Sequence, residues 1–253
     1  MNKYLAVGLG VFCFLNATHA ALYLGNGDTS DGGAVGLGSL NLSDNGTTVS
    51  ATFNKGGSAG TGFNDVLVLF IDSKAGGFTD TTHFSDASGS LQQAISGINT
   101  TGSARSTAIF ASGFAADYAI ALGFDNGIAV YHLVSGGNGS LELVRTLSFS
   151  PHDSKTQPTY NFSFTWADVG LSSGSGNTIK FESTYITASG ARKLESFESL
   201  TGAVGFDNTV TFGNYDTYPL APVPEPAQAA LTIFGTGAIS VAIFRWIRRR
   251  VDC

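Results

Sequence analysis

Cysteine is almost missing from this 253-residue sequence, since its two cysteines, Cys13 and Cys253, lie near the two ends. The long segment between them can therefore form no internal disulfide. It also offers neither a thiol nucleophile nor a cysteine-ligated metal site. Its stability has to come from a hydrophobic core, which a chain of this length is able to build.

Charged residues are also scarce, at 13% of the sequence, and those in the central segment are mostly acidic. Between Ala21 and Val223 there are 8 lysines and arginines against 17 aspartates and glutamates, which gives a net charge near −9. Such a charge repels a phosphate backbone, so it argues against nucleic acid as a partner. It is compatible with a soluble protein in a hydrated matrix.

Long amphipathic helices are a third absence. Between the terminal segments no stretch keeps a 3.6-residue period over three turns, and only residues 89–98 and 165–171 favour short helices. No repeat of fixed period is present either, which argues against a solenoid or a propeller.

The central segment is instead rich in short strand-like runs separated by Gly, Asn, Asp and Ser. Residues 48–54 alternate, whereas the continuous apolar run at 65–72 predicts a strand buried on both faces. Asn126-Gly127 between two apolar runs predicts a hairpin. Further strands are expected at 117–124, 127–134, 140–149, 159–166, 178–187 and 208–212, with Ile179, Phe181 and Tyr185 facing inward. We therefore predict an all-β fold, an antiparallel β-sandwich of jelly-roll type.

The beginning of the sequence has the three-part layout of a secretory signal peptide. Lys3 is followed by an apolar run at 4–15 and then by small residues. Because Thr18 and Ala20 fit the small-residue positions, cleavage is predicted between Ala20 and Ala21. An uncleaved anchor helix is the alternative, but the apolar run is short for one.

Near the other end, an uncharged run from Ala227 to Phe244 is just long enough to cross a membrane. A cluster of basic residues suited to a cytoplasmic flank follows it: Arg245, Arg248, Arg249 and Arg250. A buried core helix is the alternative, although it would lack the usual polar face. The expected boundaries are a signal peptide at 1–20, a β-sandwich at 21–215, a linker at 216–226, a transmembrane helix at 227–247 and a basic cytoplasmic tail at 248–253.

The motif Pro224-Glu225-Pro226 stands directly before this apolar run. Motif, apolar helix and arginine cluster, in this order, resemble the PEP-CTERM sorting signal of exported proteins of Gram-negative bacteria. The resemblance covers about the last thirty residues. It implies that the protein is held in the membrane until an exosortase recognises the motif, and is then sorted to the cell envelope or to an extracellular polysaccharide (biofilm) matrix. It implies no activity for the central domain.

Residues 65–187 resemble DOMON-like and family-9-type carbohydrate-binding β-sandwiches in the order of their motifs. The matching residues are Asp117-Tyr118 and Val169-Gly170-Leu171. This resemblance implies a sandwich, and it makes carbohydrate binding an alternative function. No exposed aromatic platform can be identified from the sequence, since Trp166 and the aromatic residues that alternate before it are more typical of a core.

No residue pattern predicts catalysis. Two G-x-S-x-G matches, around Ser58 and Ser172, lack the strand and helix that a nucleophile elbow requires. The central histidines, His83, His132 and His152, show no metal-binding spacing. The imidazole of His132 is expected to face either the wall of the sandwich or the surface. Four aspartates stand at expected strand ends and are interpreted as turn residues: Asp65, Asp72, Asp117 and Asp168.

Asp28 and Asp31, in a Gly- and Asn-rich stretch, are the best candidates for calcium ligands. The stretch lacks the regular alternation and closing glutamate of an EF-hand loop, so an acidic surface turn is favoured and no metal or cofactor is predicted. The sequence thus predicts a non-enzymatic, exported envelope or matrix protein with a structural or polysaccharide-associated sandwich. A carbohydrate-binding module, with or without calcium, and a glycoside hydrolase with two carboxylates are the alternatives.

Overall fold

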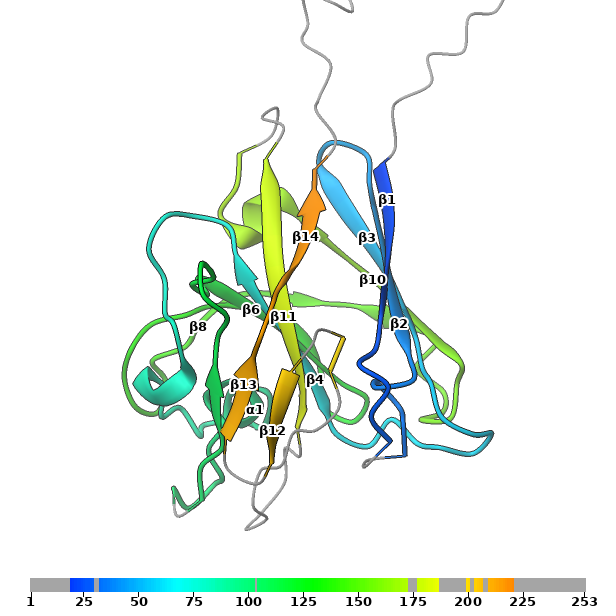
Figure 1. The fold of residues 1–253 in the computed structure, drawn as a ribbon, viewed down its shortest axis with the longest axis horizontal. Helices are drawn as coiled ribbons and strands as arrows, with labels where there is room; N and C mark the ends of the chain where they lie inside the picture. Colours follow the sequence, from blue (N-terminus) through cyan, green and yellow to red (C-terminus); the bar gives the residue numbers. More distant parts are fainter. Residues whose placement is uncertain are drawn as a thin grey trace, which may run out of the picture.

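The computed structural model describes residues 19–29, 32–102, 104–172, 177–186, 199–200, 203–206 and 209–220. These residues are mostly β, in two large antiparallel sheets and one small sheet (Figure 1). The predicted all-β class is therefore confirmed. The signal-peptide residues before His19, the Pro-Glu-Pro motif, the helix at 227–247 and the terminal arginines all lie outside the described residues. Within those that are described, no helix has the length and apolar character needed to cross a membrane.

The first large sheet has five strands. Their order across the sheet is β1 (His19–Leu24), β2 (Ser39–Asp44), β3 (Thr48–Asn54), β10 (Thr159–Thr165) and β9 (Phe149–Ser150). The second large sheet has six strands, in the order β14 (Asp216–Pro219), β11 (Thr178–Ile186), β4 (Val66–Asp72), β6 (Tyr118–Gly123), β7 (Gly127–His132) and β8 (Glu142–Leu147).

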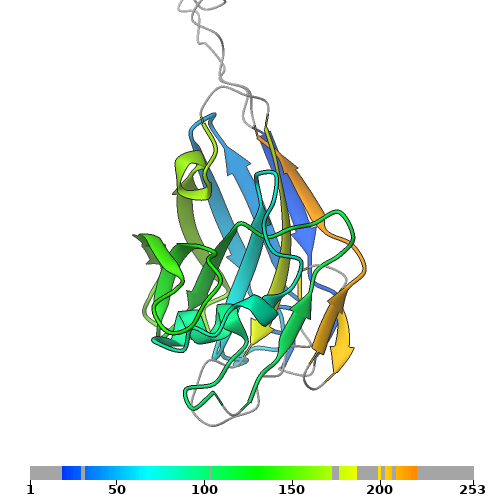
Figure 2. The same cartoon turned by 90° about the vertical axis from the view of Figure 1, so that its left-hand side faces the viewer.

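Smaller elements lie on the far side of the six-stranded sheet. They are the three-stranded sheet β12 (Ala203–Phe206), β13 (Thr209–Phe212) and β5 (Thr107–Ile109), the helix α1 (Ser90–Ser96) and the 3₁₀ helix η1 (Thr81–His83). A second 3₁₀ helix, η2 (Trp166–Val169), follows β10. Figure 2 shows α1 and its neighbouring segments in front of the six-stranded sheet, with the blue strands of the five-stranded sheet behind it.

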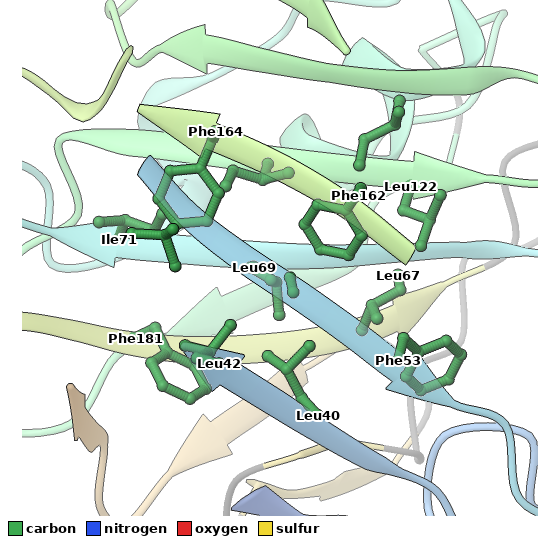
Figure 3. Close-up of a cluster of buried hydrophobic side chains, with 14 of the residues drawn as sticks. Leu40, Leu42, Phe53, Leu67, Leu69, Ile71, Leu122, Phe162, Phe164 and Phe181 are labelled. Carbon is green, nitrogen blue, oxygen red and sulfur yellow. The ribbon is translucent and has the colours of Figure 1, made fainter. Parts of the chain in front are cut away.

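The two large sheets pack face to face on a hydrophobic core. Alternate residues of β2, β3 and β10 point toward alternate residues of β4, β6 and β11, as Figure 3 shows for Leu42, Phe164 and Ile71. The aromatic residues that alternate along β10 all belong to this core, as expected from their spacing. The hairpin predicted at Asn126-Gly127 joins β6 and β7, and Gly127 adopts the positive φ of 82° that this turn requires.

Strand β4 is buried along its whole length, as its continuous apolar sequence predicted. Leu67, Leu69 and Ile71 face the core between the large sheets. Val66, Val68 and Phe70 face a second core, which α1, β13 and the segment around Phe110 cover. The domain therefore has a third layer, which the sequence analysis did not predict.

The N-terminal and C-terminal strands meet at one side of the sandwich. β1 begins and β14 ends at the same end of the domain (Figure 1). The Tyr23 hydroxyl donates to the Thr217 carbonyl (2.7 Å), and the Tyr218 hydroxyl donates to Asp44 Oδ2 (2.8 Å). β14 lies within the segment 216–226 that we expected to be a linker. It belongs to the sandwich because Tyr218 is fully buried and because β14 pairs with β11.

Candidate functional site

The residues singled out from the sequence mostly have structural surroundings. Ser58 and Ser172 are exposed in loops, where neither has the strand and helix of a nucleophile elbow. Two of the aspartates at strand ends, Asp117 and Asp168, accept hydrogen bonds that fix turns. Asp117 Oδ2 accepts from the backbone N–H groups of Ser73 (3.1 Å) and Lys74 (2.9 Å). Asp168 Oδ2 accepts from Thr165 N–H (2.7 Å) in the capping box of η2.

The two motifs behind the resemblance to carbohydrate-binding sandwiches lie side by side. The hydroxyl of Ser73 donates to the Val169 carbonyl (2.7 Å), while Ser73 N–H is bound by Asp117. Gly170 ends η2 with a φ of 73°, and a Cβ at this position would lie 2.4 Å from Tyr118 Oη. These contacts explain both motifs as parts of a turn that is packed against the end of β4.

Neither an aromatic platform nor a metal cluster emerges from the predicted positions. Trp166 is only 1% exposed and belongs to the core. His132 is partly exposed, as expected, and lies 2.9 Å from Glu142 Oε2. Asp28 is described but Asp31 is not, and the described part of the chain contains no group of three or more His, Cys, Asp or Glu that could hold a metal ion.

The most distinctive surface is the outer face of the five-stranded sheet. In β2, β3 and β10 every second residue points inward and is buried, and the residues between them point outward. All of the outward residues are Ser, Thr or Asn: Ser39, Asn41, Ser43, Thr48, Ser50, Thr52, Asn54, Thr159, Asn161, Ser163 and Thr165. We call this surface the hydroxyl–amide face. It carries no charge, although the central segment as a whole is strongly acidic.

Strand register arranges these side chains in rows across the sheet. Ser43 pairs with Ser50, which pairs with Ser163 on its other side. The next row is Asn41, Thr52 and Asn161, and β9 extends it with Ser150. Each row therefore crosses the strands roughly at right angles, and adjacent strands are about 4.8 Å apart. On the β1 border, Leu22 and Leu24 are 60% and 67% exposed and end the face with an apolar edge.

Hydrogen bonds within the face hold its amides in place. The Thr52 hydroxyl donates to Asn161 Oδ1 (2.8 Å), and Asn161 Nδ2 points to the Ser150 carbonyl (3.4 Å). Asn54 Nδ2 donates to the Ser39 hydroxyl (3.1 Å). Hydroxyl and amide groups can each donate and accept hydrogen bonds, which suits a ligand with the same mixed chemistry.

A shallow groove of about 340 Å³ runs over β10 on this face. It is lined by Ser50, Ala51 and Thr52 of β3, by Ser148, Phe149 and Ser150, and by Asn161, Phe162 and Ser163 of β10. The groove forms because β9 pairs with β10 only at Asn161 and Phe162, so the chain leaves the sheet at this point. Its size is within the range of ligand pockets. No carboxylate lines it, so it gives no support to the paired acids of a glycoside hydrolase.

Sequence reasoning missed this face even though it identified two of its strands. In the stretches 48–54 and 159–165 the alternating large apolar residues are the stronger signal, and they define the core. The signal lay in the residues between them, which are Ser, Thr and Asn without one lysine or glutamate. Exposed strand positions usually include charged residues, so a run of neutral ones over three paired strands is informative.

A separate polar group is enclosed in the second core. Glu182 of β11 is completely buried, and its Oε1 accepts a hydrogen bond from Ala111 N–H (3.0 Å). Burial raises the pKa of this carboxyl to about 8, and the nearby charge of Asp72 acts in the same direction. Because Glu182 is not accessible from the surface, we do not count it as part of the binding site.

No family model, curated protein or solved structure matches the chain. The function is therefore inferred from the hydroxyl–amide face, from the composition and from the resemblance of the C-terminal segment to a sorting signal.

Proposed function

We propose that the protein is a non-catalytic, exported component of the cell envelope or extracellular matrix, where its β domain associates with polysaccharide. The C-terminal segment is the sorting signal: the helix at 227–247 holds the protein in the membrane, and an exosortase acts at Pro224-Glu225-Pro226. The jelly-roll type of connection between the sheets stays a prediction, as does signal-peptide cleavage between Ala20 and Ala21.

The hydroxyl–amide face is the observation that supports this proposal. Polysaccharides present hydroxyl groups that donate and accept hydrogen bonds, and the face offers the matching chemistry over three strands. A module that holds one particular sugar would be expected to expose aromatic rings for stacking. The aromatic residues of β10 instead face the core. This favours adhesion over a broad polar surface and weighs against the carbohydrate-binding module with a stacking platform.

The placement of the first and last described strands is compatible with such a role. β1 starts and β14 ends at one end of the domain (Figure 1), while the hydroxyl–amide face covers a flank of the sandwich. A domain attached to the membrane through the residues after β14 would keep this flank open to the surrounding matrix.

The sorting proposal predicts that Glu225→Ala blocks processing. In a Gram-negative host that carries an exosortase, wild-type protein should be released from the membrane fraction, and its intact mass should show loss of the residues after the Pro-Glu-Pro motif. The variant should stay mostly in the membrane fraction with its C-terminus intact, because the recognition motif is broken. Glu142→Ala, on the exposed strand β8, is the control and should be processed normally. A mature exported form that retains Cys253 would refute the proposal.

A further inference from the structure

We propose that the groove over β10 binds an uncharged polysaccharide chain, which lies across the rows of the hydroxyl–amide face. This inference rests on the proposed function, because it specifies the ligand class of the polysaccharide-associated domain. It is carried by the charge distribution, the strand register and the direction of the aromatic side chains.

The charge distribution excludes an anionic polymer as the preferred ligand. Polysaccharides that carry carboxylate or sulfate groups are bound most strongly where lysine or arginine lines the site. None of the outward residues of β2, β3 and β10 is basic. The net charge of the central segment, near −9, adds a general repulsion.

The basic side chains that the structure describes are also engaged elsewhere. Three of them form ion pairs with aspartates: Arg145 with Asp168, Lys155 with Asp125, and Lys180 with Asp72. Two donate to backbone carbonyls, Lys55 to Gly56 and Arg105 to Thr81 and Phe84. Lys74 donates to the Tyr118 hydroxyl (2.8 Å). Turning any of them toward a ligand would first break these contacts.

The register gives the groove a regular set of hydrogen-bonding groups. Ser50 and Ser163 are directly paired neighbours, and Thr52 and Asn161 form the next row. Since outward residues recur at every second position of a strand, neighbouring rows are about 6.6 Å apart, and a chain that lies across them meets a new set of hydrogen-bonding groups at each row. The Thr52–Asn161 hydrogen bond fixes the side-chain amide before binding, which lowers the entropy cost of holding a ligand.

Because the aromatic residues of β10 point inward, binding of a single sugar is expected to be weak. Tyr160, Phe162 and Phe164 belong to the core, so sugar rings find no stacking partner on β10. Each exposed hydrogen bond contributes little by itself, because it replaces a hydrogen bond to water. A single sugar is therefore held weakly, whereas a polymer that contacts several rows, or several copies of the protein, gains from multivalency.

Affinity electrophoresis of the protein, purified as the cell exports it, tests this inference. Native gels are cast with neutral polymers (dextran, hydroxyethyl cellulose and glucomannan) or with anionic ones (alginate and polygalacturonate). We expect at least one neutral polymer to retard the protein, the anionic polymers to leave its mobility unchanged, and a disaccharide to compete poorly.

Two substitutions that introduce a negative charge test the location of the site. Ser163→Glu and Ser50→Glu place a carboxylate on exposed positions of one row, so the domain should still fold, while retardation should fall about tenfold or more. Thr146→Glu makes the matched change on the exposed strand β8 of the other sheet and should bind like wild type. Circular dichroism checks that each variant is folded.

The inference is overturned if an anionic polymer binds more tightly than every neutral one. It also fails if no neutral polymer retards the protein, or if Thr146→Glu weakens binding as much as the two serine variants do. Failure of the proposed function would be seen in the processing experiment, as mislocalised or unprocessed protein. That result is independent of the polymer-binding gels. A protein that reaches the envelope or matrix but ignores all neutral polymers refutes only the ligand class.

Discussion

Glu182→Gln is expected to raise the melting temperature markedly at pH 8 and to leave it nearly unchanged at pH 4. The carboxyl is fully buried, and burial raises its pKa from 4.5 to about 8 in the folded protein. In the unfolded chain the group loses its proton near pH 4.5, whereas the folded protein keeps it until about pH 8. The unfolded state is therefore favoured increasingly as the pH rises through this window.

The size of the effect follows from the same shift. One unit of pKa difference corresponds to about 1.4 kcal/mol, so the wild type carries a penalty of roughly 3–5 kcal/mol above pH 8. Glutamine has no charge to bury and can still accept the hydrogen bond from Ala111. For a domain of this size the gain is on the order of 10 °C in melting temperature.

Thermal unfolding of wild type and variant between pH 4 and pH 9 measures this difference. Two charged groups near Glu182 remain in both proteins, Asp72 and its partner Lys180. Burial also raises the pKa of Asp216, to about 6. Because Asp216 is present in both proteins, its titration cancels in the comparison. Glu142→Gln, at an exposed position, should show a pH profile close to that of wild type. Equal melting temperatures of Glu182→Gln and wild type at pH 8 would show that the buried carboxyl carries no penalty.

Asp86→Asn is expected to destabilise the domain by roughly 2–4 kcal/mol at neutral pH, since it disturbs a buried and well-bonded carboxylate. Asp86 is fully buried between the segment before α1 and the loop after β7. Its Oδ1 accepts from Ser88 N–H (3.0 Å) and its Oδ2 from Leu141 N–H (3.1 Å). An amide nitrogen on either side would face one of these donors.

The pH dependence of this second substitution has the opposite sign. Burial by itself opposes ionisation of Asp86, but hydrogen bonds from Ser88, Gly139 and Leu141 outweigh it and lower the pKa. The carboxylate therefore contributes stability above the pKa of the unfolded chain, and this contribution is lost as the pH falls through the lower pKa of the folded state. Urea unfolding at a series of pH values from 7 downward should show a difference between variant and wild type that is large at pH 7 and shrinks as the pH falls. A variant as stable as wild type at pH 7 would contradict the assigned role.

The strands and the inner core were predictable because their signals are local. The alternation in β3 and β10 and the Asn-Gly turn before β7 each depend on a few adjacent residues. The third layer forms when segments that are distant in the sequence pack on the six-stranded sheet, so no local pattern predicts it. Glu182 illustrates the consequence: the alternation of Ile179, Phe181 and Tyr185 places Glu182 on the outer side of β11, where solvent is the natural expectation. It is buried because the segment around Phe110 and Ala111 covers that side.

The hydroxyl–amide face was hidden for a different reason. Serine, threonine and asparagine on a strand are individually uninformative, since each is common at exposed positions. Only the register shows that Ser43, Ser50 and Ser163 form one row, although Ser50 and Ser163 are far apart in the sequence. Strand pairing between distant segments cannot be read from a single sequence, so the face became visible only in the folded domain.

The contact between β1 and β14 has a consequence for the order of assembly. These strands come from opposite ends of the domain, and the Tyr23–Thr217 hydrogen bond joins residues 194 positions apart. Contacts of such long range form slowly and late, after the loops between them have closed. During synthesis the sandwich therefore remains open along this side until β14 becomes available. β14 closes the sandwich when it pairs with β11 and contacts β1. The domain is therefore complete only when almost all of the chain that precedes the Pro-Glu-Pro motif has been synthesised.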